Sequence, residues 1–540
     1  MRALSSFFAL SLCAAFGREV YADDVSAIAA KIDQHINARL QQEGVVPAAA
    51  VDDSGFLRRV TLDFAGRIPT VAELGAYIAS DDVDAKRKVV NRLITSPDYA
   101  YHARNQLDIM LLLKDEHNDK WREYLLEATR QNRPWDQLFR EIFLPEDTLR
   151  TDVRPVSYLK RRVQDLDAMT NDASVTWLGV NIACAKCHDH PLVEDWTQAH
   201  YYGMASFFKR TYLTKKGFLS ERFEGLPKYT NVEGEEHEAD LMFLTGMKVE
   251  APTLGIEGDA LKQLQEKIKK AEQDDKAEDP PRPDFRPRSK FVELALADDQ
   301  SRFFAKNIVN RTWARFFGRG LVHPLDQMHS QNPASHPEIL NELAEDVHTH
   351  GYDMRRLVHA IVLTEVYARG IRTESANATL EPELFAVAVP RPLSPRQLSL
   401  SCRVAGQHPE ILLGLEGQAD WEKRREQLEQ RAAGQARQLP IPDDDFQVSV
   451  SEALWFSNNG SVAGDFLNGG GDRLVGYLKA MENDAEVAAA AFRSVFSRES
   501  DEEEKQAIVS YLSERSDRRE DAIKQVVWAM MSSPEFRFNH

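Results

Sequence analysis

The chain is organised around one stretch, Asn181-Ile-Ala-Cys184-Ala-Lys-Cys187-His188-Asp-His190-Pro191, which holds two of its four cysteines and two of its fifteen histidines. Cys-x-x-Cys-His is the attachment signature of c-type haem, because two thiols three residues apart lie on one face of a helical turn and can reach both vinyl groups. The adjacent histidine then supplies an axial nitrogen to the iron. The sequence therefore predicts a haem c bound by Cys184, Cys187 and His188.

The sixth ligand of such an iron is a separate question. His190 lies two residues past His188 and is poorly placed to reach the opposite face of the macrocycle. His200 and Met204 are four residues apart, so they share one helix face and could fold back over the ring. Met204 is therefore included among the predicted haem-binding residues. An iron left with five ligands would favour small-ligand or redox chemistry over pure electron transfer.

The same stretch also has the spacing of a zinc site. Cys184-x-x-Cys187-x-x-His190, completed by His200, forms a Cys₂His₂ set, and His188 is a further candidate ligand. Such a metal would hold a fold together or carry a hydrolytic water, and the protein would then be a scaffold or an enzyme. A third possibility is a pair of thiols, reduced or joined in a disulfide, near a core histidine.

The first 22 residues have the pattern of a cleaved export signal. The apolar run from Leu4 to Phe16 is too short to span a bilayer, and Val20-Tyr-Ala22 fits the small-x-small cleavage rule. Cys13 would be removed with this segment, which leaves three cysteines in the mature chain. We therefore expect a periplasmic or otherwise exported protein, and c-type haem is attached outside the cytoplasm.

Composition excludes some classes of partner. The chain has 540 residues, of which 85 are acidic and 67 are basic, so its formal net charge is −18. Nucleic acids and anionic membrane surfaces are disfavoured, because binding to phosphate needs a basic face. The apolar runs after the signal segment are too short for a transmembrane segment.

Helical periodicity dominates the mature chain, so we predict a mainly α-helical fold with two helical halves and a small β/loop insert between them. The prolines and charges near Asp279-Pro-Pro-Arg-Pro cannot build a core and indicate a linker. The predicted division is a signal peptide at 1–22, a helical domain with the Cys-x-x-Cys-His motif at 23–210, a β/loop insert and charged helix at 211–271, a linker at 272–290 and a helical C-terminal domain at 291–540.

One pattern recurs near the two ends of the chain. Residues 89–99 end in Ser-Pro-Asp-Tyr and resemble residues 526–536, which end in Ser-Pro-Glu-Phe; residues 357–367 are a fainter third copy. Upstream, Arg67-Ile-Pro-Thr70-x-x-Glu73 parallels Arg498-Glu-Ser-Asp501-x-x-Glu504, and both have the form of a capping box. We hypothesise a duplicated helical cassette. The alternative is that capping boxes and Ser-Pro stops recur in any helical protein.

A weaker polar cluster surrounds the loop Asn332-Pro-Ala-Ser335. It contains His323, His329 and His336, with Asp326 nearby. Loop histidines are usually solvated or cap helices, and we expect that here rather than a second metal site. Ser335 is expected to be the N-cap of a helix with Pro337 in its first turn.

Several stretches resemble two known domain families. In the first half these are residues 56–70, 132–136 and 184–191, followed by Trp196 and Tyr201-Tyr-Gly203, and they resemble the planctomycete cytochrome C-like domain of unknown function. In the second half, residues 310–322, 332–338, 391–394 and 533–536 resemble the planctomycete-specific domain that usually follows it. The likeness covers nearly the whole mature chain, although residues 107–118 match the family pattern poorly.

The resemblance implies an exported bacterial protein, with an association with polysaccharide degradation through family context only. It carries over no established activity. The expected function is therefore that of a periplasmic redox or electron-transfer protein with one haem c and a redox partner protein. The alternative is a zinc-stabilised binding or scaffold protein, and whether the chain is an enzyme stays open.

Overall fold

Helices dominate the computed structural model, which describes residues 4–112, 118–145, 154–189, 193–252, 255–297, 302–373, 381–412, 418–439, 459–460 and 462–540. Within these ranges the strands are two or three residues long and form two-stranded sheets. The prediction of a mainly α-helical fold is confirmed. No helix in the described ranges is long and apolar enough to cross a bilayer.

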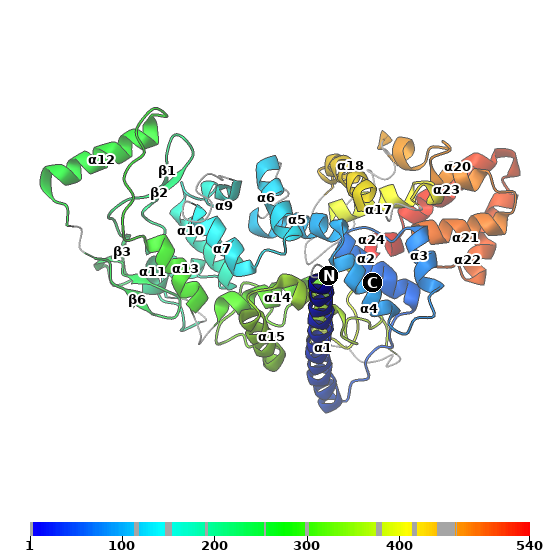
Figure 1. The fold of residues 1–540 in the computed structure, drawn as a ribbon, viewed down its shortest axis with the longest axis horizontal. Helices are drawn as coiled ribbons and strands as arrows, with labels where there is room; N and C mark the ends of the chain where they lie inside the picture. Colours follow the sequence, from blue (N-terminus) through cyan, green and yellow to red (C-terminus); the bar gives the residue numbers. More distant parts are fainter. Residues whose placement is uncertain are drawn as a thin grey trace. The chain divides into compact units, whose positions relative to one another are not determined.

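The chain forms two compact units. Unit 1 consists of residues 1–103, 316–318 and 359–540, and unit 2 of residues 104–315 and 319–358. Each unit contains sequence from both halves of the chain, as the colours along the ribbon indicate (Figure 1). The predicted domain boundaries came from motifs and composition rather than from contacts, and they stay a prediction.

The elements that begin in unit 1 are α1 (Leu4–Glu43), α2 (Asp53–Ala65), α3 (Val71–Ile78), α4 (Ala85–Ile94), α5 (Pro97–Leu112), η4 (Pro382–Leu384), β7 (Arg391–Pro392), α17 (Pro395–Ala405), η5 (Pro409–Leu412), α18 (Gln418–Ala436), η6 (Val462–Phe466), α20 (Leu474–Lys479), α21 (Asp484–Val495), α22 (Glu502–Ser513), η7 (Ser516–Arg518), α23 (Arg519–Met531), α24 (Pro534–Arg537) and β8 (Phe538–Asn539). Strands β7 and β8 pair antiparallel.

The elements that begin in unit 2 are α6 (Asp119–Arg130), α7 (Trp135–Phe143), η1 (Arg154–Val156), α9 (Ser157–Lys160), α10 (Leu166–Ala173), η2 (Ser174–Leu178), η3 (Ala183–Lys186), α11 (Gln198–Ser206), β1 (Thr211–Leu213), β2 (Leu219–Glu221), β3 (Lys228–Thr230), β4 (Glu236–Glu238), β5 (Leu241–Met242), β6 (Lys248–Val249), α12 (Gly258–Gln273), α13 (Pro287–Ala297), α14 (Phe303–Phe317), α15 (Pro337–Thr349) and α16 (Met354–Val362). The strands pair antiparallel as β1–β2, β3–β4 and β5–β6. They lie where the sequence predicted the β/loop insert.

Helix α1 begins as an apolar segment and continues as an amphipathic one without a break. Val25, Ile32, Ile36 and Leu40 form its buried stripe, as the helical period predicts. Ile28 is half-buried, whereas Ala29 is buried with the stripe. No helix end marks residue 22, and the signal peptide stays a prediction.

The core of unit 2 is unusually aromatic. Trp135 stacks on Trp177 with ring centroids 4.7 Å apart, and Phe139 lies 4.8 Å from Phe304. Arg288 is fully buried beside this core, where it pairs with Glu221 at 2.8 Å. Helices distant in sequence are therefore joined by aromatic contacts and a buried ion pair.

The hypothesised cassette recurs in unit 1 with the same hydrogen bonds. Thr70 and Asp501 each cap the following helix through a complete capping box with Glu73 and Glu504. Arg67 donates to both carboxylate oxygens of Glu73, at 2.7 and 3.1 Å. Arg498 does the same to Glu504, at 2.7 Å to each oxygen. We call residues 52–99 copy one and residues 483–536 copy two.

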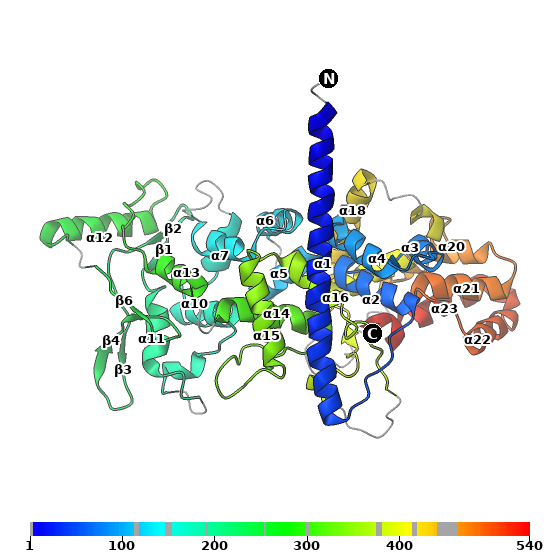
Figure 2. The same ribbon diagram turned by 60° about the horizontal axis from the view of Figure 1, so that its bottom comes forward.

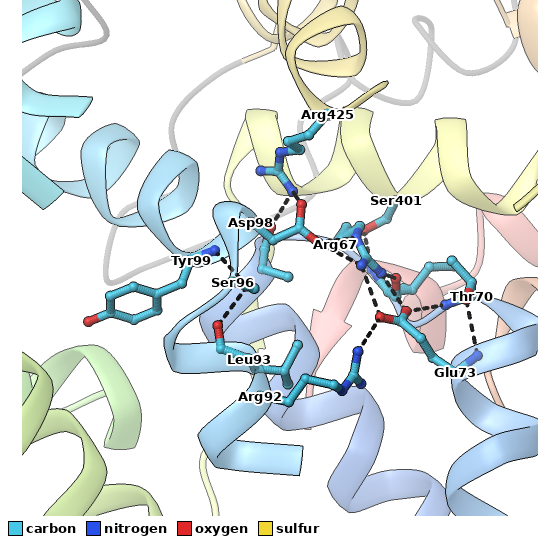
Figure 3. Close-up of polar contacts among 12 residues, drawn as sticks. Arg67, Thr70, Glu73, Arg92, Leu93, Ser96, Asp98, Tyr99, Ser401 and Arg425 are labelled. Carbon is cyan, nitrogen blue, oxygen red and sulfur yellow. Dashed lines mark hydrogen bonds and ion pairs between the residues drawn. The ribbon is translucent and has the colours of Figure 1, made fainter. Parts of the chain in front are cut away.

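The second half of each cassette also matches. The Ser96 hydroxyl accepts from the backbone of Tyr99 at 3.2 Å, as the Ser533 hydroxyl accepts from Phe536 at 3.4 Å. Each Ser-Pro-acid-aromatic stop also supplies a carboxylate to the arginine of its copy. Asp98 accepts a hydrogen bond from Arg67, and Glu535 accepts one from Arg498. Figure 3 shows this cluster in copy one. The recurrence of the capping box, the arginine contacts and the Ser-Pro stop supports duplication over chance.

The structure adds a helix to each copy that the sequence comparison did not include. Helix α2 ends at Gly66 with φ +67°, directly before Arg67, and α21 leads to Ser497 with φ +61°, directly before Arg498. Positive φ favours glycine, so a serine there indicates that the turn is retained despite its backbone strain. The faint third copy shares only the helix end, where the Thr364 hydroxyl accepts from Tyr367 at 3.1 Å.

One predicted cap is wrong. Helix α15 begins at Pro337 with His336 as its N-cap, and no side-chain cap is formed. Ser335 therefore lies one residue before the cap position, and its hydroxyl is 3.2 Å from the Nδ1 atom of His336. Pro337 does lie in the first turn, as expected, since proline at N1 needs no backbone donor.

The arginines of the two copies differ in burial, so we expect their loss to lower the free energy of unfolding by different amounts. Arg67 and Asp98 are each only 2% exposed, whereas Arg498 and Glu535 are 30% and 29% exposed. We expect Arg67→Met to lower the free energy of unfolding of unit 1 by about 3–5 kcal/mol, because it strands buried carboxylates. Arg498→Met should cost about 1 kcal/mol or less, because water solvates the carboxylates that remain. Urea unfolding of both variants measures this, and equal losses would contradict it.

Candidate functional site

The chain reaches the Cys-x-x-Cys-His turn through a single π-helical turn. Helix α10 continues into η2, which ends at Gly179 with φ +71°. A Cβ atom on Gly179 would lie 2.8 Å from the side-chain oxygen of Asn307, so only glycine fits here. Trp177 of η2 is fully buried in the aromatic core. The turn therefore starts from a rigid base, and π turns of this kind are frequent at functional sites.

Asn181 fixes the start of the turn to the loop around Asp326. Its backbone N–H donates to the Asp326 carbonyl at 2.8 Å, and its side-chain amide donates to the Asp326 carboxylate at 2.9 Å. The side-chain oxygen of Asn181 accepts from the N–H of Ala183 at 3.1 Å, which starts η3. Asp326 was expected near a solvated polar cluster, and the structure gives it this bracing role.

The three residues of the predicted haem motif lie together on the surface of unit 2. Cys184, Cys187 and His188 are exposed, and both thiols are free. The Cys187 N–H lies 3.4 Å from the Cys184 carbonyl, so the two cysteines are one turn of η3 apart. The neighbouring Ile182 and Ala185 are fully buried and hold the turn against the core.

One ring nitrogen of His188 is held by the backbone. Its Nδ1 atom lies 2.7 Å from the carbonyl oxygen of Asp189, an acceptor, so Nδ1 carries the proton. That tautomer leaves Nε2 with its lone pair, and histidine ligands usually donate their other ring N–H in this way. Asp189 in turn accepts from the N–H of Gln198 at 2.8 Å, which ties the turn to the start of α11.

His200 and Met204 are engaged elsewhere in this conformation. The Thr197 N–H donates to the Nδ1 atom of His200 at 3.3 Å, so His200 takes the place of the usual Glu or Gln in a capping box. Burial lowers the pKa of His200, although the carboxylates of Asp189 and Asp195 act in the opposite direction. Met204 is completely buried. Their roles as ligands stay predictions.

The predicted zinc ligands do not come together among the described residues. No three His, Cys, Asp or Glu side chains of the described ranges could together hold a metal ion. His190, which belongs to that set, lies outside the described residues. The set of Cys184, Cys187, His190 and His200 therefore stays a prediction.

An aromatic stack beside the turn was not predicted from the sequence. Tyr202 of α11 stacks on Tyr229 of β3 with centroids 4.2 Å apart and an angle of 7° between the rings. His237 of β4 continues the stack at 5.5 Å from Tyr229. Both ribbon views place the β3–β4 hairpin near α11 (Figure 2). Local sequence signals could not reveal this stack, because strand pairing across the hairpin and its fold-back onto α11 both depend on long-range contacts.

Charged groups also link the turn to α10. Lys186, within the motif, forms an ion pair with Asp167, and the Tyr201 hydroxyl donates to the same carboxylate at 2.6 Å. These hydrogen bonds lower the pKa of Asp167. Burial raises the pKa of Tyr202, and the nearby Lys186 acts against that shift. Lys186, which is paired with Asp167, and Tyr202 therefore lie near the thiol of Cys187.

The His200 cap predicts a pH-dependent loss of stability. The cap needs a neutral Nδ1 acceptor, and the pKa of His200 is lowered by folding, so its contribution is complete above the ordinary pKa of about 6.5 and is lost as the pH falls through the folded value. His200→Gln should keep the cap and remove this part of the pH dependence. Melting temperatures of both proteins at about pH 7.5 and 5.5 test it. The same fall in wild type and variant would contradict the capping role.

Comparison with known proteins identifies two families. Residues 31–212 match the PSCyt2 family, described as a protein of unknown function (DUF1549). Residues 287–441 match the PSD1 family, described as a protein of unknown function (DUF1553). No curated protein and no solved structure matches the chain. The order of the two matches confirms the predicted arrangement, and the chain belongs to the proteins in which a PSCyt2 (DUF1549) region is followed by a PSD1 (DUF1553) region.

Proposed function

We propose that the protein is an exported redox protein that carries one covalently bound c-type haem. The observation that carries the proposal is the exposure of two free thiols one turn apart, followed by a histidine whose Nδ1–H donates to a carbonyl. Exposed thiols can be attached to a macrocycle without opening the core. A redox partner protein would then meet the cofactor at the surface of unit 2.

The residues of the turn fit such a group. Cys184 and Cys187 would form the two thioether bonds, and Nε2 of His188 would be the axial ligand. The haem would supply one-electron transfer when bound. The backbone carbonyl of Asp189 accepts from Nδ1–H of His188, so Nε2 is the ring nitrogen that remains for a ligand. The hydrogen bonds of Asn181 and of Asp189 keep both ends of the turn in place.

Whether His200 or Met204 would also bind the haem decides the chemistry that the haem could carry out. His200 accepts a backbone hydrogen bond through Nδ1, and Met204 lies in the core. With both side chains engaged in this conformation, a bound haem would be able to take up a small ligand. Binding of carbon monoxide to the reduced protein would distinguish this from an iron with two protein ligands.

The alternative is a zinc-stabilised binding or scaffold protein that uses Cys184, Cys187, His190 and His200. Its support is the Cys-x-x-Cys-x-x-His spacing. Zinc bound through Nε2 of His200 would require that nitrogen to lose its proton, while Nδ1 already accepts from Thr197. The zinc site would thus remove a helix cap, whereas the haem site leaves it in place. A role in polysaccharide degradation rests on family context alone.

Expression of the exported chain together with the haem-attachment machinery tests the proposal. We expect a Soret band, an α-band in the reduced spectrum and a mass increase of one haem under denaturing conditions. Cys184→Ser with Cys187→Ser should abolish covalent attachment. Cys402→Ser is the matched control, because Cys402 is buried and its pKa is raised to about 12, which makes it inert. A colourless protein with one zinc per chain would establish the alternative instead.

A further inference from the structure

Three arginines of unit 1 come together where α18 meets the residues before α20. Arg424 and Arg431 lie on α18, and Arg473 directly precedes α20. Arg424 and Arg431 are two helical turns apart, so they share one face of α18. Helix α18 packs along α17, and Figure 1 shows the two helices next to each other. We call Arg424, Arg431 and Arg473 the three-arginine cluster.

Hydrogen bonds through Gln407 hold two of these arginines in place. The Arg424 guanidinium donates to the side-chain oxygen of Gln407 at 2.7 Å, and Gln407 is only 7% exposed. The backbone of Gln407 pairs antiparallel with that of Arg473. Next to this bridge, the His408 N–H donates to the carbonyl of Asp472 at 3.1 Å. Arg424 and Arg473 therefore lie on either side of one buried amide.

Positive charge exceeds negative charge in the three-arginine cluster. Neither Arg424 nor Arg431 forms an ion pair with another residue of the described ranges. Asp472 lies 3.6 Å from the Nε atom of Arg473, which is too far for a hydrogen bond. Three arginines and one aspartate leave a charge of about +2, in a chain whose formal net charge is −18.

A fourth arginine nearby is already neutralised. Arg403 of α17 donates to the Asp465 carboxylate at 3.2 Å and lies 3.5 Å from the backbone carbonyl of Arg431. Its ion pair with Asp465 balances its charge without reducing that of the three-arginine cluster.

The arrangement costs stability in the form that the structure shows. Burial lowers the pKa of Arg424, and the charges of Arg431 and Arg473 lower it further, although Asp472 acts in the opposite direction. The Nε–H groups of Arg424 and Arg473 are buried and find no acceptor among the described residues. Like charges side by side and buried donors without an acceptor both disfavour the folded state. Features that cost stability in this way are typical of functional sites.

We propose that the three-arginine cluster binds a doubly charged oxyanion, namely a phosphate or sulfate group. Guanidinium groups present pairs of N–H donors in a plane, which match the oxygens of such an anion. Two negative charges would balance the excess charge of the cluster and remove the repulsion among Arg424, Arg431 and Arg473. The site belongs to unit 1, whereas the Cys-x-x-Cys-His turn belongs to unit 2, so the proposal does not depend on the group bound at that turn.

Thermal unfolding of the full chain with inorganic phosphate or sulfate tests the proposal, because an anion that binds the folded state raises the melting temperature. Sodium chloride keeps the ionic strength constant throughout. We expect a saturable rise with either anion, and Arg424→Gln and Arg431→Gln should each weaken the apparent affinity about tenfold. The matched control is Lys423→Gln, which removes the same charge from an exposed position next to Arg424 and should leave the affinity unchanged.

The same variants separate anion binding from a structural role. Arg431 is exposed and its side chain forms no hydrogen bond with a described residue, so Arg431→Gln keeps the test valid if Arg424→Gln fails to fold. Without phosphate or sulfate, Arg431→Gln should leave the melting temperature unchanged or raise it, because it removes repulsion. A lower melting temperature of Arg431→Gln under these conditions would indicate a structural role and would overturn the proposal.

Two further probes define the anion. Acetate at the same ionic strength should raise the melting temperature less, because it carries one charge, and an equal rise would contradict the assignment to a doubly charged group. Phenyl phosphate distinguishes the source: tighter binding than inorganic phosphate supports a group carried by a larger ligand, and equal or weaker binding supports the free ion. No saturable rise beyond that with sodium chloride alone, or equal weakening by Lys423→Gln, would overturn the proposal.

Discussion

A guanidinium buried between carboxylates is the interaction on which this fold depends most. Arg67 joins the end of α2 to Glu73 on α3 and to Asp98 at the start of α5, with almost no exposure to water. Burial alone would raise the pKa of Glu73, but Arg67 overrides it and lowers that pKa to about 2. Arg288 plays a comparable part in unit 2. Such pairs stabilise a fold when hydrogen bonds satisfy their buried charges, and Arg67 with its two carboxylates fixes the helix ends around it.

The described cysteines form no disulfide in this fold. Cys184, Cys187 and Cys402 are all free, and the first two are exposed. Hydrogen bonds of Asn181 and Asp189, rather than sulfur chemistry, hold the turn that carries them. The turn also connects the two matched regions of the chain. Asn181 lies in the PSCyt2 region, and Asp326, which accepts its hydrogen bond, lies in the PSD1 region.

Local chemistry made much of this structure predictable from the sequence. The capping boxes at Thr70 and Asp501, the β/loop insert and the proximity of Cys184, Cys187 and His188 all follow from signals within a few residues. The stack of Tyr202 on Tyr229 and the bracing by Asp326 were not predictable, because they join segments far apart in the chain. The cap at Ser335 was predicted wrongly, because a local motif fits two adjacent start positions and the surrounding loop selects His336.

The two copies of the cassette differ outside their shared polar contacts. Both copies keep the capping box, the arginine and the Ser-Pro stop, which are the parts that hold the helices together. What differs is the outer surface, where Ser80 and Asn91 of copy one correspond to Tyr511 and Trp528 of copy two. Conservation of the internal contacts leaves that surface free to change at little cost in stability, since exposed substitutions away from such contacts have small effects.

The identity of the bound group is tested most directly by anomalous diffraction at the iron and zinc absorption edges, with crystals of the protein purified from its exported form. The haem assignment predicts an iron peak beside the turn, with density continuous from Cys184 and Cys187 to a planar macrocycle and His188 as the axial ligand. A zinc peak among four Cys and His ligands, or no metal beside the turn, would contradict it.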